Sequence, residues 1–191
     1  MPVSSTRAST AHQTQGSYPK GIAKRKEILS AALDAYATSG HAGPTLNAIA
    51  DAVGLTVAGV LHYFPSREHL FVEILRARDE ADVARLDAAA PAGDGPWAVL
   101  RSTTSTPGLV KLFVDMSAAA ADPSHPAHDF MLLRTRGLAE RLADLNGVSA
   151  GDWRIPVLIA AAEGLQIQWL REPSVDIVGS LQRLAHVLLS T

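Results

Sequence analysis

The sequence contains no cysteine among its 191 residues. Disulfide bonds and thiolate metal sites are therefore excluded, and the reducing cytoplasm is the expected compartment. Aromatic residues make up only 5% of the chain, whereas hydrophobic residues reach 47%, a normal share for a soluble globular protein. The chain has no apolar run of membrane-spanning length, and its first twenty residues lack the apolar core of a signal peptide. We therefore expect a cytoplasmic protein that makes no membrane contact.

Patterns typical of β-strands are also missing. Apolar residues recur at helical spacing instead, and alanine and leucine, which favour helices, run through much of the chain. Residues 1–18 are polar and rich in Ser, Thr and Gln, which predicts a disordered tail, and the run PAGDGP at 91–96 predicts a linker. We expect an all-α fold of about nine helices, spanning roughly 20–39, 46–53, 57–63, 67–90, 97–103, 107–121, 126–145, 152–171 and 175–189.

The segment IADAVGLTVAGVLHYF, residues 49–64, has the pattern of a helix-turn-helix. Two short helices that cross steeply need a small residue at their contact, a glycine in the turn and buried aliphatic residues around it. Ala50, Gly54 and Val60 meet these needs, because glycine adopts positive φ at low cost. An ordinary helical hairpin would show the same spacing, so this alternative stays open on the pattern alone.

The run from Arg25 to Leu70 resembles the DNA-binding domain of the TetR family of bacterial transcription regulators. The resemblance is carried by Arg25, Ile28-Leu29, Ala31-Ala32, Gly40, Thr45, Ile49-Ala50, Gly54-Leu55-Thr56, Phe64-Pro65-Ser66-Arg67-Glu68 and Leu70. Residues 122–128 (DPSHPAH) and 163–176 (EGLQIQWLREPSVD) also resemble one branch of this family. After the polar tail at 1–18, the resemblance implies a helix-turn-helix DNA-binding domain at 19–66 and a larger effector-binding and dimerisation domain at 67–191.

The charge distribution agrees with this division. Residues 1–67 hold six basic and three acidic side chains, although the whole chain has a net charge of −2. The remaining residues hold eleven basic and sixteen acidic side chains. A basic head on an acidic body is expected if only the head meets phosphates.

The resemblance assigns residues 56–63 to a recognition helix that enters the major groove of operator DNA. It implies that the hydroxyls of Thr45 and Thr56 meet phosphates, and that Arg67 replaces the family's usual phosphate-binding lysine. Leu61 stands where the family often has a phosphate-contacting tyrosine, and Tyr63 where it often has histidine. Tyr63 could equally be structural. The full set of expected DNA contacts is Lys24, Arg25, Thr45, Thr56, Val57, Ala58, Gly59, His62, Tyr63 and Arg67.

A single motif makes too few contacts for tight binding, so we expect a homodimer that spans two half-sites. The family dimerises through its last two helices. Small and apolar residues on these helices suit such an interface, although they could instead be satisfied within one monomer. The residues are Ala160, Ala161, Gly164, Leu181, Leu184, Val187 and Leu188.

The family's body usually holds a pocket for a small-molecule effector, and we expect one here of unknown identity. Its candidate lining comprises larger or polar residues on the middle helices: Phe113, Met116, Phe130, Leu133, Glu163, Gln166 and Trp169. A polar group on an apolar helix is costly unless it is paired, so Glu163 and Gln166 could await a ligand. The apolar members could equally be ordinary core, and Glu163 could pair with an arginine.

The sequence gives little support for a metal site or a catalytic site. His125 and His128, with Asp129 beside them, make a thin ligand set, and the loop that starts the next helix is the better interpretation. We find no nucleophile with a base, no phosphate-binding glycine loop and no paired carboxylates, so we expect neither an enzyme nor a cofactor. We therefore predict a one-component transcription regulator, in the form of a repressor released by its ligand. The alternatives are an effector-blind assembly protein and a helical enzyme or carrier.

Overall fold

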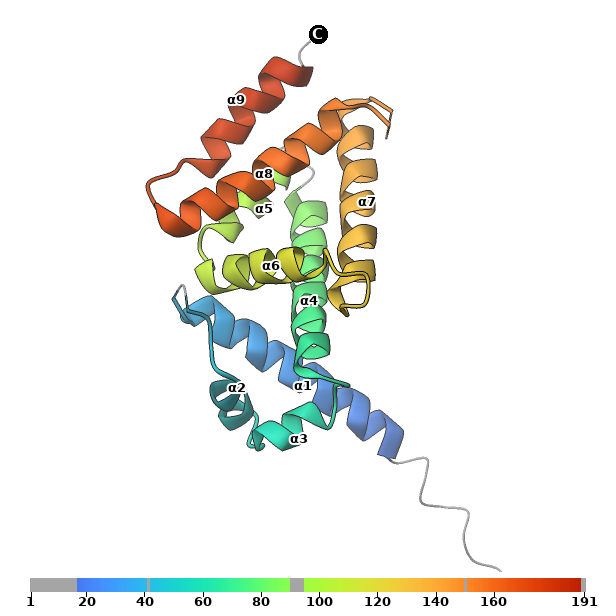
Figure 1. Cartoon of the computed structure of the whole chain (residues 1–191), viewed down its shortest axis with the longest axis vertical. Helices are drawn as coiled ribbons and strands as arrows, with labels where there is room; N and C mark the ends of the chain where they lie inside the picture. The colour runs from blue at the N-terminus through green and yellow to red at the C-terminus, as the bar shows by residue number, and fades with distance from the viewer. Residues whose placement is uncertain (1–16, 41, 90–94, 150, 190–191) are drawn as a thin grey trace, which may run out of the picture.

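The computed structural model describes residues 17–40, 42–89, 95–149 and 151–189. These residues form nine α-helices and no strand, which confirms the predicted all-α class (Figure 1). The predicted tail, apart from Ser17 and Tyr18, and residues 91–94 of the predicted linker lie outside the described residues. The helices are α1 Ser17–Thr38, α2 Leu46–Ala52, α3 Val57–Leu61, α4 Arg67–Ala89, α5 Gly95–Thr103, α6 Pro107–Ala119, α7 Ala127–Asn146, α8 Arg154–Arg171 and α9 Ile177–Leu189.

Short polar side chains begin three of these helices. The Thr45 and Thr56 hydroxyl oxygens accept from the backbone N–H groups of Ala48 and Gly59, and Ser66 accepts from His69 N at 3.3 Å. These bonds satisfy donors that have no partner inside the helix. The third helix is two residues shorter than predicted, because Tyr63 N bonds to Val60 O at 3.0 Å in a tight turn that ends it.

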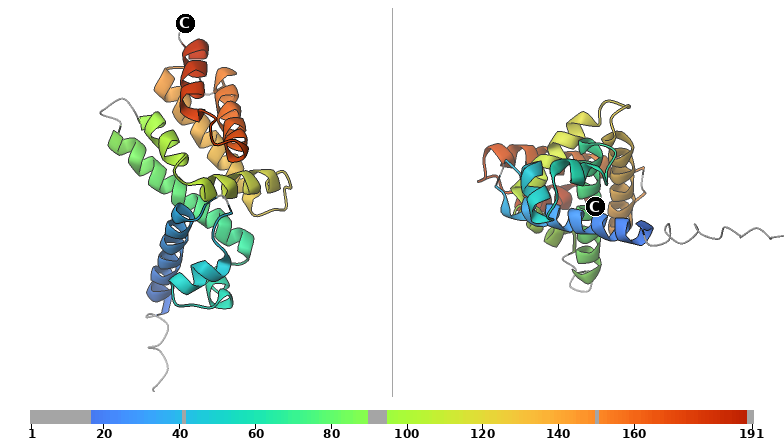
Figure 2. Two further views of the ribbon diagram at one scale, coloured as in Figure 1. Left: turned by 90° about the vertical axis from the view of Figure 1, so that its left-hand side faces the viewer. Right: turned by 90° about the horizontal axis from the view of Figure 1, so that it is seen from below.

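The helices form two parts, which we call the head (α1 to α3) and the body (α4 to α9). Helices α1, α2 and α3 lie at one end of the molecule, and α8 and α9 lie at the other (Figures 1 and 2). Helix α4 runs from the head into the body, where it packs against α5, α6 and α7. Helix α9 returns alongside α8.

One hydrophobic core crosses the boundary between head and body. Its buried head residues include Ile28, Ile49 and Val60, and its buried body residues include Phe113 and Phe130. Leu70 and Ile74 of α4, both fully buried, belong to the same cluster. The head is thus packed directly onto α4 and α6, and a shift of either helix must disturb it.

Hydrogen bonds of charged side chains also connect α5 and α7 to α4. The buried Arg78 donates to the Thr103 hydroxyl of α5 at 3.1 Å and lies 3.5 Å from the Asp82 carboxylate. Burial lowers the pKa of Arg78 and raises that of Asp82, because both charged forms lose water. Arg134 of α7 bonds to Asp79 of α4 at 2.9 Å.

A tyrosine is wedged where the head meets α6. Tyr36 of α1 is 5% exposed, and burial raises the pKa of its hydroxyl to about 12. A Cβ added to Gly43, in the loop before α2, would lie 2.9 Å from the Tyr36 ring. A Cβ added to Gly108, at the start of α6, would lie 3.2 Å from the ring and from Gly40 O. These two glycines let α1, the loop before α2 and the start of α6 meet around one ring.

Candidate nucleic-acid interface

Helices α2 and α3 form the predicted helix-turn-helix. Ala50 and Val60 are each 1% exposed and join the core between α1 and α4. The turn is closed by Leu55 N donating to Ala50 O at 2.9 Å, and Gly54 has φ +65°. Glycine reaches this left-handed conformation without the steric penalty of a Cβ. The three residues therefore have the packing and turn roles that their spacing predicted.

The two threonine caps lie on the outside of the motif. Thr45 and Thr56 are exposed, and each hydroxyl oxygen accepts from a backbone N–H at 3.1 Å. An oxygen that accepts this bond still carries its own proton, which can be donated outward. Each cap thus offers a positioned hydroxyl donor at the outer surface of the head.

The remaining outer face of α3 is small and almost uncharged. Ala58 and His62 are exposed, and Val57 and Gly59 are half-buried. Arg67, at the start of α4, is exposed, and its guanidinium lies 5.0 Å from the centroid of the Phe71 ring. This stacking holds the guanidinium of Arg67 against the ring, while the exposed side chain keeps its charge accessible to an anion.

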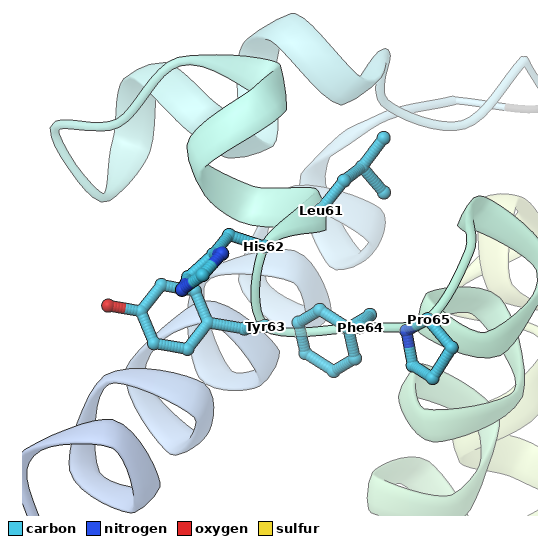
Figure 3. A pocket seen from close by; sticks show the side chains of 5 residues that line it. All are labelled: Leu61, His62, Tyr63, Phe64 and Pro65. Atoms are coloured by element: carbon cyan, nitrogen blue, oxygen red, sulfur yellow. The ribbon is translucent and has the colours of Figure 1, made fainter.

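The end of α3 carries two rings on one side of the chain. Figure 3 shows His62 and Tyr63 close together, with Leu61 directed away from them. Their ring centroids are 5.7 Å apart in an edge-on arrangement. The segment from Leu61 to Pro65 lines a surface hollow of about 480 Å³. Tyr63 is half-buried and packs on the core, so it combines a structural contact with an accessible edge.

Lys24 and Arg25 have partners inside the fold. Lys24 donates to Val53 O at 2.9 Å, at the end of α2, and pairs with Glu27 at 2.8 Å. Arg25 pairs with Glu73 of α4 at 2.9 Å and lies 4.9 Å from the centroid of the Phe64 ring. Lys24 therefore connects α1 to α2, and Arg25 connects α1 to α4. Lys26, the next residue, is exposed on the same helix.

The seven expected pocket residues lie in several different environments. Phe113, Met116 and Phe130 are buried in the core shared by head and body. Trp169 lies in a second cluster with Val110, Ile177 and Leu181. Leu133 is 65% exposed, and Glu163 is half-buried. Gln166 is buried, and its Nε2 donates a hydrogen bond to Ala162 O at 3.3 Å.

Some of the residues expected at a dimer interface are buried within the monomer, and others are exposed to solvent. Leu181 is 3% exposed and faces the monomer's own core. Ala160 is exposed, Val187 is 74% exposed, and Leu184 and Leu188 are half-buried. A Cβ added to Gly164 would meet nothing within 4 Å, so packing within one chain does not require this glycine.

The two histidines before α7 hold their loop together. His128 Nδ1 lies 2.8 Å from Ala120 O, and Ala127 N donates to His125 Nδ1 at 3.1 Å. Helix α7 begins at Ala127, which confirms the interpretation of this segment as the start of a helix.

Comparison with known proteins gives the class of the head. Residues 28–74 match the model of "Bacterial regulatory proteins, tetR family". The chain is 42% identical to the HTH-type transcriptional regulator RutR of Escherichia coli K12 over 67 residues, which cover 35% of this chain and 32% of RutR. It is 31% identical to the HTH-type transcriptional repressor KstR of Mycolicibacterium smegmatis over 110 residues, which cover 51% of this chain and 54% of KstR. The matches thus span about a third to a half of these curated relatives.

Solved structures extend the likeness of fold to the body. A transcriptional regulator from Rhodococcus sp. Rha1 superposes with a TM-score of 0.60 at 20% identity, covering 87% of this chain and 94% of that one. NalD of Pseudomonas aeruginosa, described as the secondary repressor of a multidrug efflux pump, superposes with a TM-score of 0.52 at 16% identity, covering 90% and 96%.

The structure therefore consists of an exposed helix-turn-helix on a helical body. Residues 28–74 are thus similar to the N-terminal domain of TetR-type regulators. None of the helices in the described part of the chain is long and apolar enough to cross a membrane.

Proposed function

We propose that the protein is a one-component transcription regulator that binds double-stranded operator DNA and represses from it. The observation that carries this proposal is the outer face of the head, where Thr45, Thr56, His62 and Arg67 surround a small, uncharged helix surface. The names of KstR and NalD as repressors favour repression over activation. A protein that binds chromosomal DNA acts in the cytoplasm, and no catalytic step is part of this role.

The contacts divide into phosphate binding and base reading. Arg67 and the hydroxyls of Thr45 and Thr56 bind phosphates, which position the head but carry no sequence information. Ala58 and Val57 offer apolar contacts to thymine methyl groups, and His62 is the polar side chain that reaches base edges. Because few side chains read bases directly, DNA shape contributes strongly to specificity. Lys24 and Arg25 act indirectly, by holding α1 against α2 and α4, and Gly59 and Tyr63 shape the surface.

We further propose a twofold dimer through α8 and α9, with the domain division at residue 66. Two heads then meet two half-sites, and operator symmetry matches protein symmetry. The exposed apolar side chains Val157, Ile167 and Val187 favour this face. Contiguous exposed apolar patches often mark contacts with another chain.

The proposed effector is a small apolar or amphipathic molecule that enters the body among the seven candidate residues. Displacement of α4 or α6 would then reach the head through the shared core. One observation favours a second candidate, an effector-blind protein: none of these residues lines the hollows at Leu61–Pro65 or between α6 and α8. Release of bound DNA by a small molecule, measured over a ligand library, separates the two.

Fluorescence anisotropy with the DNA upstream of the protein's own gene tests DNA binding. We expect the affinity to fall linearly on a logarithmic salt scale, because each phosphate contact releases condensed cations. Affinity that does not change with salt, or no binding at any salt concentration, would contradict the proposal.

A further inference from the structure

The segment that connects α6 to α7 carries two histidines whose rings are in opposite hydrogen-bonding states. Ala127 N donates to His125 Nδ1 at 3.1 Å, and His128 Nδ1 lies 2.8 Å from Ala120 O. A backbone N–H group can only donate, and a backbone carbonyl can only accept. The Nδ1 atom of His125 therefore has no proton, whereas Nδ1 of His128 carries one. The neutral ring of His125 is thus protonated at Nε2.

Uptake of a second proton has different consequences for the two rings. His128 would take it at Nε2, which leaves the bond from Nδ1–H to Ala120 O in place. His125 can take it only at Nδ1, so the bond from Ala127 N–H is lost. Ala127 is 0% exposed, so no water can replace the histidine as an acceptor. An unpaired buried donor is unfavourable, and the first turn of α7 must therefore rearrange.

A carboxylate of α4 lies near His125. Hydrogen bonds from its own backbone N–H and from the Ser66 hydroxyl lower the pKa of Glu68, and the charges of Arg67 and His125 lower it further. Because water and salt screen charges at a protein surface, this effect of His125 places the ring close to Glu68. His69, the next residue of α4, has its Nδ1 3.1 Å from the Ser66 hydroxyl and belongs to the same group of titratable side chains.

The other titratable groups around His125 belong to its own loop and to α7. Hydrogen bonds from Ser124 lower the pKa of Asp122, and the charges of His125 and His128 contribute. Asp129, in the first turn of α7, is exposed, and the last turn of α6 has no titratable side chain. Histidine exchanges its proton between about pH 5 and 8, where carboxyls with a lowered pKa are ionised. A protonated His125 therefore meets negative charge.

We propose that His125 is a proton-operated switch where the head meets the body. Neutral His125 holds the start of α7 by accepting from Ala127 N–H. Protonated His125 releases this bond and forms an ion pair with the Glu68 carboxylate of α4. Acidification thus exchanges a bond within the α6–α7 segment for a bond between this segment and α4.

Both partners of the switch lie where a displacement reaches the head. Ala127 and Phe130 of α7 belong to the core that head and body share. Glu68 follows Arg67, the proposed phosphate contact, at the start of α4. We therefore expect acidification to move the head from its DNA-binding position and to lower DNA affinity. This consequence rests on the proposed function, whereas the switch itself does not.

Nitrogen-15 NMR of the full-length protein tests the switch without DNA. At about pH 8 the His125 ring should be the Nε2–H tautomer and the His128 ring the Nδ1–H tautomer, which differ in their nitrogen shifts. As pH falls, the Ala127 amide proton should move upfield with the same midpoint as the His125 ring, because its hydrogen bond is lost. An Nδ1–H tautomer at His125, or an Ala127 amide that does not follow this ring, would overturn the proposal.

Two asparagine variants separate the histidines. In His125→Asn, Oδ1 takes the place of Nδ1 and accepts from Ala127 N–H at every pH, so the amide shift should stay constant. His128→Asn is the matched control, because its Nδ2 can replace Nδ1 as the donor to Ala120 O. This variant should keep the response of the parent protein. A pH response of the Ala127 amide in His125→Asn equal to that of the parent protein would also overturn the switch.

Glu68→Gln tests the second partner of the protonated ring. Loss of the carboxylate should lower the pH at which His125 takes up its proton, because the ion pair no longer favours the charged ring. Glu80→Gln removes the same charge from an exposed position of α4 and should leave the titration unchanged. Equal midpoints of His125 in Glu68→Gln and in the parent protein would exclude Glu68 as the partner and contradict the proposal.

Fluorescence anisotropy at fixed salt measures the consequence for DNA binding. Between about pH 7.5 and 5.5 the affinity of the parent protein should fall by about fivefold or more relative to that of His125→Asn. Exposed His62 titrates in both proteins, so the comparison removes its contribution. An equal pH dependence of the two proteins would overturn the regulation of DNA binding by this switch. If neither protein binds DNA at any pH, the proposed function fails and the NMR result alone decides the switch.

Discussion

At the residue scale, the proposed DNA binding depends on a few exposed side chains that have few partners within the fold. Arg67 stacks on Phe71 yet remains exposed, whereas Arg25 is engaged with Glu73 and Phe64. The two arginines are alike in sequence as basic residues of the head, but their partners differ. A cation that already has a carboxylate partner gains less from a phosphate.

Arg67→Ala should weaken DNA binding about equally for every sequence and reduce the slope of log affinity against log salt by roughly one. The physical reason is the loss of one phosphate contact with its released cation. Fluorescence anisotropy over a range of salt concentrations measures both effects. Arg136→Ala removes the same charge from an exposed position of α7 and should change neither quantity. A weakening confined to one DNA sequence would show that Arg67 reads bases.

Asp152 confers a pH dependence on stability at the start of α8. Hydrogen bonds from Arg154 lower the pKa of Asp152 to about 2, and Arg154 also donates to Leu188 O of α9 at 3.0 Å. A carboxyl whose pKa is lowered in the folded state stabilises it above the unfolded pKa, and loses this effect as pH falls towards the folded pKa.

We expect the stability difference between the parent protein and Asp152→Asn to be full at pH 6 and to shrink steadily as pH falls from about 4 to 2. Urea unfolding at a series of pH values measures this difference. A difference that stays constant across the series would show that Asp152 contributes nothing through its charge.

At the element scale, the turn between α2 and α3 sets the direction of α3. Gly54 has φ +65°, and a Cβ there would meet nothing within 4 Å. A side chain at position 54 is therefore disfavoured by the backbone conformation and not by contact with neighbouring atoms. Gly147, after α7, has φ +64° and equally open surroundings, which makes it a matched control.

Gly54→Ala and Gly147→Ala should each lower the free energy of unfolding by about 1–2 kcal/mol, because alanine is disfavoured in the left-handed region. Only Gly54→Ala should also weaken DNA binding, since its turn orients α3. Denaturant unfolding and anisotropy measure the two effects separately. Equal DNA affinity of the two variants would show that the head tolerates a distorted turn.

Sequence patterns predicted most of the elements and less of the contacts between them. Thr45, Thr56 and Ser66 marked helix starts because caps are local, and glycine marked the turn for the same reason. Partners such as Val53 O for Lys24 and Glu73 for Arg25 are distant in sequence, and periodicity alone does not fix how one helix is rotated against another. Leu133 illustrates this limit: it continues the apolar stripe of α7 and yet is 65% exposed.

The exposed side of α8 was partly visible in the sequence. Ala160 and Gly164 signalled close approach, but Trp153 precedes the helix and its exposure depends on the tertiary fold. Leu181 has the same apolar character as its neighbours in α9, and only the structure shows that it faces the monomer's own core. Solvent exposure, which separates interface from core, is a property of the folded chain.

At the scale of the whole molecule, one core joins the head to the body. Gly108 lies at this junction, against Tyr36 and the end of α1. Because interiors are close-packed, a larger side chain there must move α6 or the head instead of being absorbed.

Gly108→Val should lower the free energy of unfolding by about 1–3 kcal/mol and weaken DNA binding even though it lies outside the helix-turn-helix. Thermal unfolding and anisotropy measure the two effects. Gly137→Val in α7, where a Cβ would meet nothing within 4 Å, is the control and should leave DNA binding unchanged. Unchanged DNA affinity in Gly108→Val would show that head and body are not coupled at this joint.

Selection from a library of random DNA duplexes tests sequence-specific binding by a dimer, because the bound duplexes carry the sequence that the protein prefers. We expect enrichment of an inverted repeat whose half-site centres are one helical turn of about 10 base pairs, or a multiple of it, apart. The Arg67→Ala variant should enrich the same repeat with lower yield. Recovery of no sequence above the starting library would contradict the proposed function.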